Sequence, residues 1–324
     1  MSEAPIPDVE QFRHKLLAVA YRMLGTVADA EDAVQDAYLR YHQHATDINS
    51  PEGWLVRTTT RLCIDRLRTA RREEYVGQWL PEPVPETWGG AGSDRAELTE
   101  SLSMAFLVLL ETLSPAERAT YLLREVLGYE FDEIGEVLEK TPVNVRQIAA
   151  RARKRLETRE RRYAAPVGVA DDLAAQFFAA CRSGDAGAIE AMLAADVTLI
   201  SDGGGKAFAA KEPVVGTRKV ANLFAVVFRK LRPVSKLTLT TINGGLGAVF
   251  VTNGAPFEVI TLATEGASVS RLYVTLNPDK LRLWSDAPAG AGTKRPLPWS
   301  KNANGTPPEL REAEPGAAEG DVRD

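Results

Sequence analysis

The sequence predicts a multidomain fold in which two all-α domains, the second a helix-turn-helix, precede an α+β domain with a curved antiparallel sheet. Apolar residues recur at helical spacing through most of the first 160 residues. Residues 131–156 have the proportions of a helix-turn-helix, with an eight-residue helix, a short turn and a second helix. After about residue 169, two short helices precede a series of strand patterns, which is typical of an α+β domain.

The first domain is expected over residues 8–73 and contains three helices. Helical periodicity covers residues 10–25 and 28–43, and after the polar loop 44–50 a long basic helix begins at Pro51 and runs to about residue 72. The second helix is apolar on one face. Its other face carries Asp29, Glu31, Asp32, Gln35 and Asp36.

The second domain is expected over residues 98–163, after an acidic linker at 74–97 in which Pro and Gly interrupt any periodicity. Within it, Ser114 and Glu117 have the spacing of a capping box and predict the start of a helix. The second helix of the helix-turn-helix is strongly basic. A solvated charged helix is the simplest interpretation of such a run, but its position in this motif favours DNA reading.

The α+β domain is expected over residues 168–287, and the tail 288–324, rich in Pro, Gly, Ala and Glu, is expected to be disordered. A strand at 197–201 precedes an amphipathic helix at 217–230. The remaining strand patterns occupy residues 234–242, 247–252, 256–264, 269–276 and 281–284.

Composition excludes several other classes of protein. The net charge is −5, so the positive charge is confined to the two basic helices, and we expect weak DNA binding without a protein partner. Cys63 and Cys181 lie far apart and have no metal-ligand spacing, which argues against a disulfide framework or a structural zinc site. We expect no cofactor. No apolar run approaches about 18 residues. We therefore expect a soluble, cytoplasmic protein that does not enter a membrane.

The residue types on the basic helices suit promoter binding and opening. Arginines neutralise phosphates, small polar side chains hydrogen-bond an extruded base, and an aromatic ring stacks on it. Trp54 is more simply interpreted as a core residue. The candidates in the first domain are Asp47, Asn49, Ser50, Trp54, Arg57, Arg61, Arg66 and Arg68. Those in the helix-turn-helix are Val143, Asn144, Arg146, Gln147, Arg151, Arg153 and Lys154. Together with an acidic surface for a basic protein partner, they point to transcription initiation.

Several short strings, in this order, resemble the extracytoplasmic-function sigma factors. They are Met23-Leu24-Gly25, the acidic segment from Ala28 to Tyr38, Trp54-Leu-Val-Arg57, Ser114-Pro-Ala-Glu-Arg118 and the final helix-turn-helix. Three further strings resemble the subgroup with a fused SnoaL-like C-terminal domain, the SigJ type. They are Trp79-Leu-Pro-Glu-Pro83, Asp202-Gly-Gly-Gly-Lys206 and Asn277-Pro-Asp-Lys-Leu281.

The resemblance covers residues 8–287 and implies a function for each part. It assigns the acidic face to the clamp helices of the β′ subunit of core RNA polymerase, with the β subunit as a further partner. It assigns the first domain to the −10 element and the helix-turn-helix to the −35 element of promoter DNA. The C-terminal domain is then a ketosteroid-isomerase-like cone that modulates activity in cis, in a chain expected to be monomeric.

We predict that two loops of the C-terminal domain and the tryptophan segment of the linker form a regulatory contact between domains. The residues are Trp79, Leu80, Pro81, Asp202, Gly203, Gly204, Gly205, Lys206, Asn277, Pro278, Asp279 and Lys280. Two structural turns that make no contact between domains are the simpler alternative. A small-molecule ligand in the cone is a further hypothesis.

Two other functions stay open from the sequence. A helix-turn-helix repressor with a ligand-sensing domain explains residues 131–156 but gives the first domain no task, and it would bind a palindrome as a dimer. A SnoaL-like isomerase or cyclase needs an acid/base pair. Asp202, Glu258 and Asp279 are the carboxylates available, but no two form a recognisable signature and the domain lacks histidine. We assign no catalytic residue.

Overall fold

The structure is a computed structural model that describes residues 9–44, 48–69, 75–88, 102–160, 167–231 and 235–285. No helix among these residues is both long enough and apolar enough to cross a membrane.

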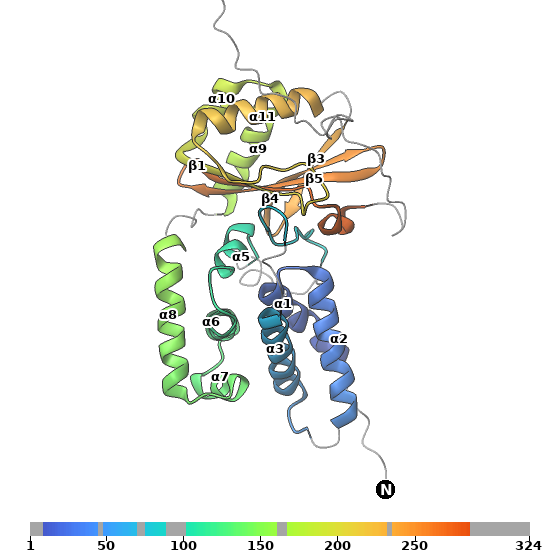
Figure 1. Cartoon of the computed structure of the whole chain (residues 1–324), viewed down its shortest axis with the longest axis vertical. Helices are drawn as coiled ribbons and strands as arrows, with labels where there is room; N and C mark the ends of the chain where they lie inside the picture. The colour runs from blue at the N-terminus through green and yellow to red at the C-terminus, as the bar shows by residue number, and fades with distance from the viewer. Residues whose placement is uncertain are drawn as a thin grey trace, which may run out of the picture. The chain divides into compact units, whose positions relative to one another are not determined.

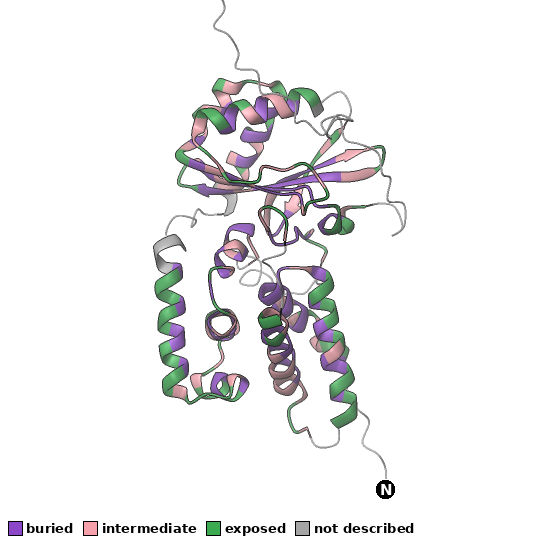
Figure 2. Ribbon diagram, in the orientation of Figure 1, coloured by how far each residue is buried: buried purple, intermediate pink, exposed green. Residues whose placement is uncertain are grey.

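The first helical domain is a bundle of α1 (Arg13–Leu24), α2 (Val27–His44) and α3 (Pro51–Thr69), preceded by the 3₁₀ helix η1 (Val9–Phe12) (Figure 1). The predicted helix end at Gly25 is confirmed: Gly25 has a left-handed φ of 78°, and its amide donates to Tyr21 O. Helix α2 buries one face and exposes the other, as the periodicity predicts, whereas the second half of α1 is buried on all sides (Figure 2).

The second helical domain contains the predicted helix-turn-helix. Its elements are α5 (Met104–Leu110), α6 (Pro115–Tyr121), the π-helical turn η4 (Leu122–Val126), α7 (Phe131–Leu138) and α8 (Pro142–Glu160). The capping box of Ser114 and Glu117 is present. The turn after α7 requires Gly135, because a Cβ there would lie 2.7 Å from Lys140 O. The helix-turn-helix prediction is confirmed.

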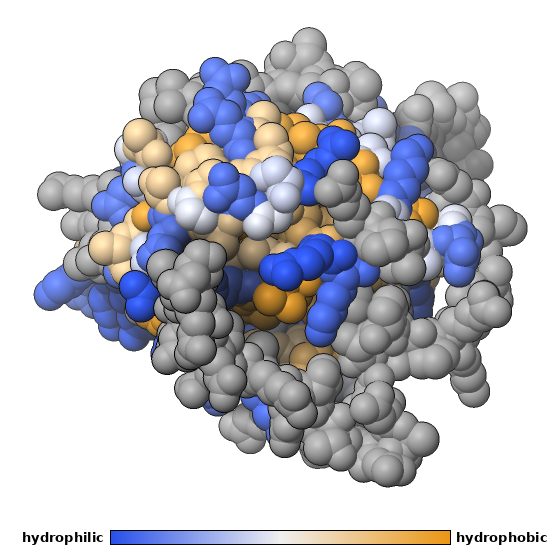
Figure 3. All heavy atoms as spheres, turned by 90° about the horizontal axis from the view of Figure 1, so that it is seen from above, coloured by the Kyte–Doolittle hydropathy of each residue, from blue (hydrophilic) through white to orange (hydrophobic). Residues whose placement is uncertain are grey.

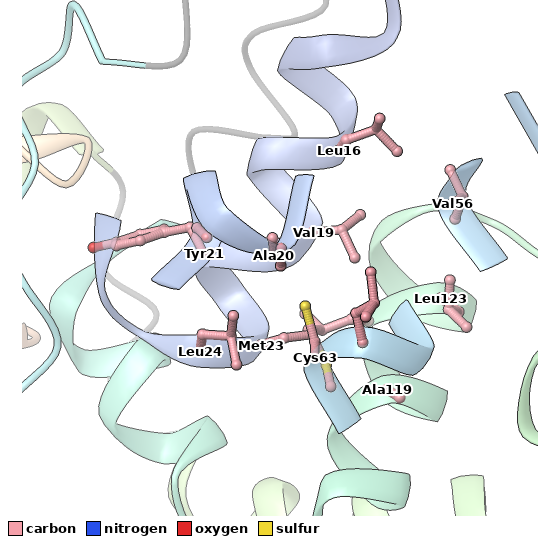
Figure 4. Close-up of a cluster of buried hydrophobic side chains, with 14 of the residues drawn as sticks. Leu16, Val19, Ala20, Tyr21, Met23, Leu24, Val56, Cys63, Ala119 and Leu123 are labelled. Atoms are coloured by element: carbon pink, nitrogen blue, oxygen red, sulfur yellow. The ribbon is translucent and has the colours of Figure 1, made fainter. Parts of the chain in front are cut away.

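The two helical domains share one hydrophobic core. Side chains of α1 and α3 pack in a single cluster with residues of α6 and η4. In Figure 4, Val19 and Met23 of α1 and Val56 of α3 lie beside Ala119 and Leu123. The helix that bears the −10 candidates is therefore packed directly against the domain that bears the −35 candidates.

The C-terminal domain is α+β, as expected. Its helices are α9 (Val167–Ser183), α10 (Ala186–Ala191) and α11 (Thr217–Leu231). Its strands are β1 (Leu193–Asp202), β2 (Val214–Val215), β3 (Lys236–Ile242), β4 (Gly245–Thr252), β5 (Ala255–Glu265) and β6 (Ser268–Thr275). The sheet order is β2-β1-β6-β5-β4-β3. The fold class is confirmed with one correction: the sheet is mixed, because β1 runs parallel to β6. After β1 the chain crosses through α11 and the β3–β6 meander before it pairs again with β1.

The expected strand at 281–284 is wrong. The chain forms the 3₁₀ helices η5 (Pro278–Lys280) and η6 (Arg282–Trp284) there. Leu281 is buried against Ile242, Val249 and Val259, so the segment packs across one face of the sheet rather than pairing with an edge. An apolar alternation of four residues does not distinguish these two placements.

The two faces of the sheet have different neighbours. Helices α9, α10 and α11 cover one face (Figure 1). Their outer surface mixes hydrophilic and hydrophobic residues (Figure 3), and α11 buries Val220, Phe224 and Phe228 against the sheet. The other face contributes Ala263 and Tyr273 to a cluster with Leu80 of the linker and Met104 of α5.

Candidate functional site

The acidic face of α2 is accessible. Asp29, Glu31, Asp32 and Gln35 are exposed and Asp36 is half-buried. Arg66 of α3 lies against this face rather than apart from it: its Nη2 is 2.8 Å from Asp36 Oδ2, and its Nη1 donates to Asp29 O. Leu39, one turn beyond Gln35, is 55% exposed. Leu39 was not among the residues predicted from the sequence, although its place on the helix extends this surface.

The loop before α3 is only partly described. Asp47 lies outside the described residues, whereas Asn49 and Ser50 are exposed. Ser50 Oγ accepts a hydrogen bond from the Gly53 amide and so caps α3. Trp54 packs on the core with its ring centroid 5.8 Å from that of Tyr41, which favours the core interpretation over base stacking.

Two of the arginines predicted for the −10 element form ion pairs and hydrogen bonds with the end of α7, the first helix of the helix-turn-helix. Arg57 Nη2 lies 2.7 Å from Glu136 Oε2, and Arg61 Nη1 lies 3.1 Å from Glu139 Oε1. Arg61 also donates to the Val137 and Glu136 carbonyls at the end of α7. Those carbonyls lack intrahelical partners, and a cation is favoured at this end of the helix dipole. Arg68, by contrast, is exposed and pairs with Asp65.

Helix α8 has a buried face and an exposed face that carries the residues predicted to read the −35 element. The residues buried at helical spacing are Val145, Ile148, Ala149, Ala152 and Leu156. The seven candidates predicted for the −35 element, from Val143 to Lys154, are all exposed. Three of them have neighbours in their own domain: Arg153 forms a two-nitrogen contact with Glu125, Arg151 lies 3.9 Å from Glu117, and Arg146 lies over the Phe131 ring. The first turn of α8 therefore offers the most open part of this face.

Asp202, at the end of β1, is the centre of a buried network. Its side chain is fully buried and accepts four hydrogen bonds. Oδ1 accepts from Tyr75 (2.5 Å) and the Gly204 amide (3.0 Å), and Oδ2 accepts from the Leu80 amide (2.9 Å) and Lys280 Nζ (2.7 Å). Burial, reinforced by the hydrogen bond to Asp202, raises the pKa of Tyr75. Two of the four donors come from the linker, so this carboxylate joins the linker to the C-terminal domain.

Trp79 brings three parts of the chain together. Its ring centroid lies 4.2 Å from Lys280 Nζ in a cation–π contact, and the same ammonium donates to Leu80 O. The edge of its six-membered ring fills the space that a Cβ at Gly25 would occupy, with Cη2 2.4 Å from that position. Gly25 therefore both ends α1 and admits the linker tryptophan.

Both predicted loops of the C-terminal domain, residues 202–206 and residues 277–281, also contact the linker. Asn277 fills the space beside Gly204, where its amide nitrogen lies 2.3 Å from the position of a Cβ, and Gly205 abuts Val76. Asn277 Nδ2 donates to Tyr75 Oη. Lys206 and Asp279 form an exposed ion pair, while Pro278 begins η5 and Gly203 has no room for a Cβ beside Ala207 O.

A second contact between the C-terminal domain and the linker was not predicted from the sequence. Asn243, in the β3–β4 turn with a left-handed φ of 50°, donates to Tyr21 Oη of α1 and accepts from the Val84 amide. Tyr21 in turn donates to Glu82 O. Glu82 Oε2 accepts from the Val27 amide and so caps α2, and burial raises the pKa of this carboxyl. An Asn between two strands predicts only a turn, so nothing in the local sequence indicates that Asn243 contacts α1 and the linker.

No group of three or more His, Cys, Asp or Glu side chains among the described residues is placed to hold a metal ion.

Comparisons with known proteins agree with this arrangement. Residues 9–73 match the family Sigma-70 region 2, and residues 103–156 match Sigma-70, region 4. The chain is 34% identical to the ECF RNA polymerase sigma factor SigJ of Mycobacterium tuberculosis, over 85% of this chain and 92% of that one. It is 29% identical to the probable ECF RNA polymerase sigma factor SigI of the same species, over 83% and 92%. The crystal structure of Mycobacterium tuberculosis SigJ superposes with a TM-score of 0.68 at 33% identity, covering 85% of this chain and 97% of that one.

Proposed function

Because this chain belongs to the extracytoplasmic-function sigma factors, we propose that the closed arrangement described above is its resting form, which must open before both promoter elements are read. As an alternative sigma factor it serves transcription initiation by core RNA polymerase at −35/−10 promoters. The fused C-terminal domain fits regulation in cis. The residues that carry each task are part of the proposal.

The observation that carries the proposal is the contact of Arg57 and Arg61 with α7. Two elements centred about 25 base pairs apart are separated by about 85 Å of straight duplex, at 3.4 Å per base pair. Helix α3 and the helix-turn-helix, joined by ion pairs of 2.7 and 3.1 Å, do not span that distance. The same ion pairs occupy Arg57 and Arg61, the arginines that we propose for phosphate binding, with acidic side chains.

The polymerase-binding face is available in this closed form. Four members of the acidic face are exposed, on the side of α2 opposite to its buried residues: Asp29, Glu31, Asp32 and Gln35. We infer that a basic surface of the polymerase β′ subunit meets them first, with the rate advantage of electrostatic steering. Opening then follows or accompanies this contact.

The linker network supplies the regulatory contact. Trp79 lies between Gly25 and Lys280, and Asp202 accepts from both linker and loop donors. While these contacts hold, residues 75–88 tether the C-terminal domain to the first helical domain. We infer that the C-terminal domain thereby stabilises the closed form, and that losing these contacts favours the open one.

The test compares Glu136→Gln/Glu139→Gln with Asp132→Asn, an exposed acid of α7 outside the contact. Donor and acceptor dyes are attached to cysteines placed at the exposed positions Gln43 and Ala150. We expect the double variant to lower energy transfer before polymerase is added and to raise promoter-specific transcription, while Asp132→Asn behaves as wild type. Unchanged energy transfer when active holoenzyme forms would refute the closed resting form but leave the sigma activity intact.

The remaining expectations are parts of the same proposal. One chain carries both readers of an asymmetric promoter, so we propose that it acts as a monomer, which light scattering after size exclusion tests. We propose that it acts in the cytoplasm, where core RNA polymerase and promoter DNA, its proposed partners, are found. A symmetric footprint on a palindrome would instead favour the repressor.

We also propose that the C-terminal domain regulates rather than catalyses, because the Asp202 carboxylate accepts hydrogen bonds from the linker and Asp279 forms an ion pair with Lys206.

A further inference from the structure

One buried carboxyl in the C-terminal domain takes no part in the linker network. Glu258 of β5 pairs directly with Phe250 of β4, so the two side chains leave the same face of the sheet. Phe250 is in ring contact with Phe228 of α11, with centroids 5.1 Å apart. Glu258 therefore lies on the helix-covered face, opposite to the face that holds the linker.

Aromatic rings dominate this interior. From Phe250 and Phe228, ring contacts continue through Phe224 to Phe177 of α9, at centroid distances of 5.8 and 5.4 Å. All four rings are buried, with 4% or less of their surface exposed. The side chain of Glu258 thus leaves the sheet beside Phe250, at one end of an apolar cluster that extends between the helices and the sheet.

The carboxyl is buried without the partners that such a group needs. Glu258 is 4% exposed, and its Oε2 makes no hydrogen bond within the structure. The contrast with Asp202, on the same sheet and accepting from four donors, shows that this fold does satisfy a buried carboxylate elsewhere. Burial raises the pKa of Glu258 to about 8. At neutral pH the group is mostly a neutral acid, and therefore a hydrogen-bond donor as well as an acceptor.

We propose that Glu258 is the polar end of a binding site for a small neutral ligand, with an apolar ring body and a hydrogen-bond acceptor such as a ketone oxygen. The rings of Phe224, Phe228 and Phe250 contact the body of the ligand, and the carboxylic acid donates to its oxygen. An unsatisfied buried polar group is destabilising, and a hydrogen bond to the ligand oxygen would satisfy it on binding. Polar groups that are few and convergent in an apolar interior are typical of ligand sites.

This site is placed to affect the regulatory contact. Neighbouring residues of a strand point to opposite faces, and Val259, next to Glu258, packs on the cluster that contains Leu281 and contacts Trp284. Trp284 Nε1 donates to Pro83 O of the linker. The regulatory meaning of the ligand rests on the proposed function, whereas binding itself does not.

The test measures binding to the full chain without polymerase, so its failure leaves the sigma proposal untouched. The probe is 6-propionyl-2-(dimethylamino)naphthalene, a neutral fluorescent ketone whose emission reports both polarity and hydrogen bonding at the carbonyl. Its cationic counterpart is 2-naphthylmethylamine. The variants are Glu258→Gln, which keeps a donor, Glu258→Leu, which has none, and Glu265→Gln, an exposed control on the same strand.

We expect wild type, Glu258→Gln and Glu265→Gln to bind the ketone with dissociation constants within about threefold of one another. Glu258→Leu should bind about five- to tenfold more weakly, the loss of one hydrogen bond, with emission shifted to the blue. Thermal melting of each variant shows that it is folded, and removal of a buried acid makes Glu258→Leu the most stable. Equal binding by Glu258→Leu, stronger binding of the amine, or no binding to wild type would overturn the proposal.

Discussion

Replacing Asp202 by Asn should release the linker. The carboxylate accepts from Tyr75, the Gly204 and Leu80 amides and Lys280 Nζ, and its side chain is fully buried. An Asn side chain offers one acceptor oxygen, so two of the four donors face an NH₂ group instead. Two lost hydrogen bonds to a charged acceptor amount to about 3–6 kcal/mol. Removing one partner of a buried ion pair gives a similar figure of about 3–5 kcal/mol.

Amide hydrogen exchange detects the release at the affected atoms. The Leu80 amide donates to Asp202, and the Glu82 amide donates to Gly25 O in the first helical domain. A loss of 3 kcal/mol corresponds to a fall in protection of roughly a hundredfold. Both linker amides should lose protection together, because they belong to one docked segment.

A matched control separates this effect from a general loss of charge. Asp279→Asn removes a half-exposed carboxylate that pairs with Lys206 in the adjacent loop, and exposed ion pairs are worth at most about 1 kcal/mol. It should leave the Leu80 amide protected. If Asp202→Asn leaves both linker amides as protected as in wild type, the network does not hold the linker and the reasoning fails.

Three further predictions concern other residues. Glu258→Gln should remove a pH dependence: the pKa of Glu258 is about 8 when folded against 4.5 when unfolded, so its stabilising contribution is complete below pH 4.5 and lost as pH rises through 8. Between pH 4.5 and 8, the unfolding free energy measured by denaturant titration should fall in the wild type, relative to this variant, by about 1.4 kcal/mol per pH unit, roughly 5 kcal/mol in all. Equal slopes for the two proteins would disprove the prediction, and Glu265→Gln, an exposed carboxyl on the same strand, is the control. Asn243→Gly keeps a left-handed turn but removes the contacts to α1 and the linker, so it should cost about 1–3 kcal/mol, whereas Asn253→Gly, at a similar turn with φ of 53°, should be nearly neutral in the same measurement. Arg146→Ala should weaken binding to a −35 duplex by about 1–3 kcal/mol and relax discrimination at one base pair, and a uniform loss across sequences would instead indicate a phosphate contact.

Local chemistry is what the sequence predicted best. The capping box at Ser114, the left-handed end of α1 at Gly25 and the limits of the helix-turn-helix each depend on residues within about five positions of one another. These features depend on interactions within a single helical turn, so residue spacing and residue type are enough to predict them. The acidic face of α2 belongs to the same class, because one helix positions all its members.

Contacts between distant segments were not predictable in the same way. The Arg57 and Arg61 guanidinium groups satisfy carbonyl and carboxylate groups of α7 some 75 to 79 residues later, and nothing near either arginine indicates that choice over phosphate. Asn243 joins Tyr21 across 222 residues. The parallel pairing of β1 with β6 likewise depends on how the whole meander returns, since each strand pattern alone fits either direction.

The linker connects the acidic face of α2, the proposed polymerase-binding surface, to the C-terminal domain. Glu82 caps α2, the helix that bears the acidic face, while Trp79 and Leu80, within three residues of it, contact Lys280 and Asp202. Undocking the linker therefore removes a cap worth about 1 kcal/mol from α2 as it frees the C-terminal domain. Coupling of this kind is reciprocal. If polymerase binds the undocked form more tightly, polymerase binding shifts the linker towards undocking, and undocking raises the affinity for polymerase by the same factor. Asp202→Asn should then bind core polymerase more tightly than wild type although the substitution lies in another domain, and unchanged affinity would mean that polymerase binds the docked and undocked forms equally well.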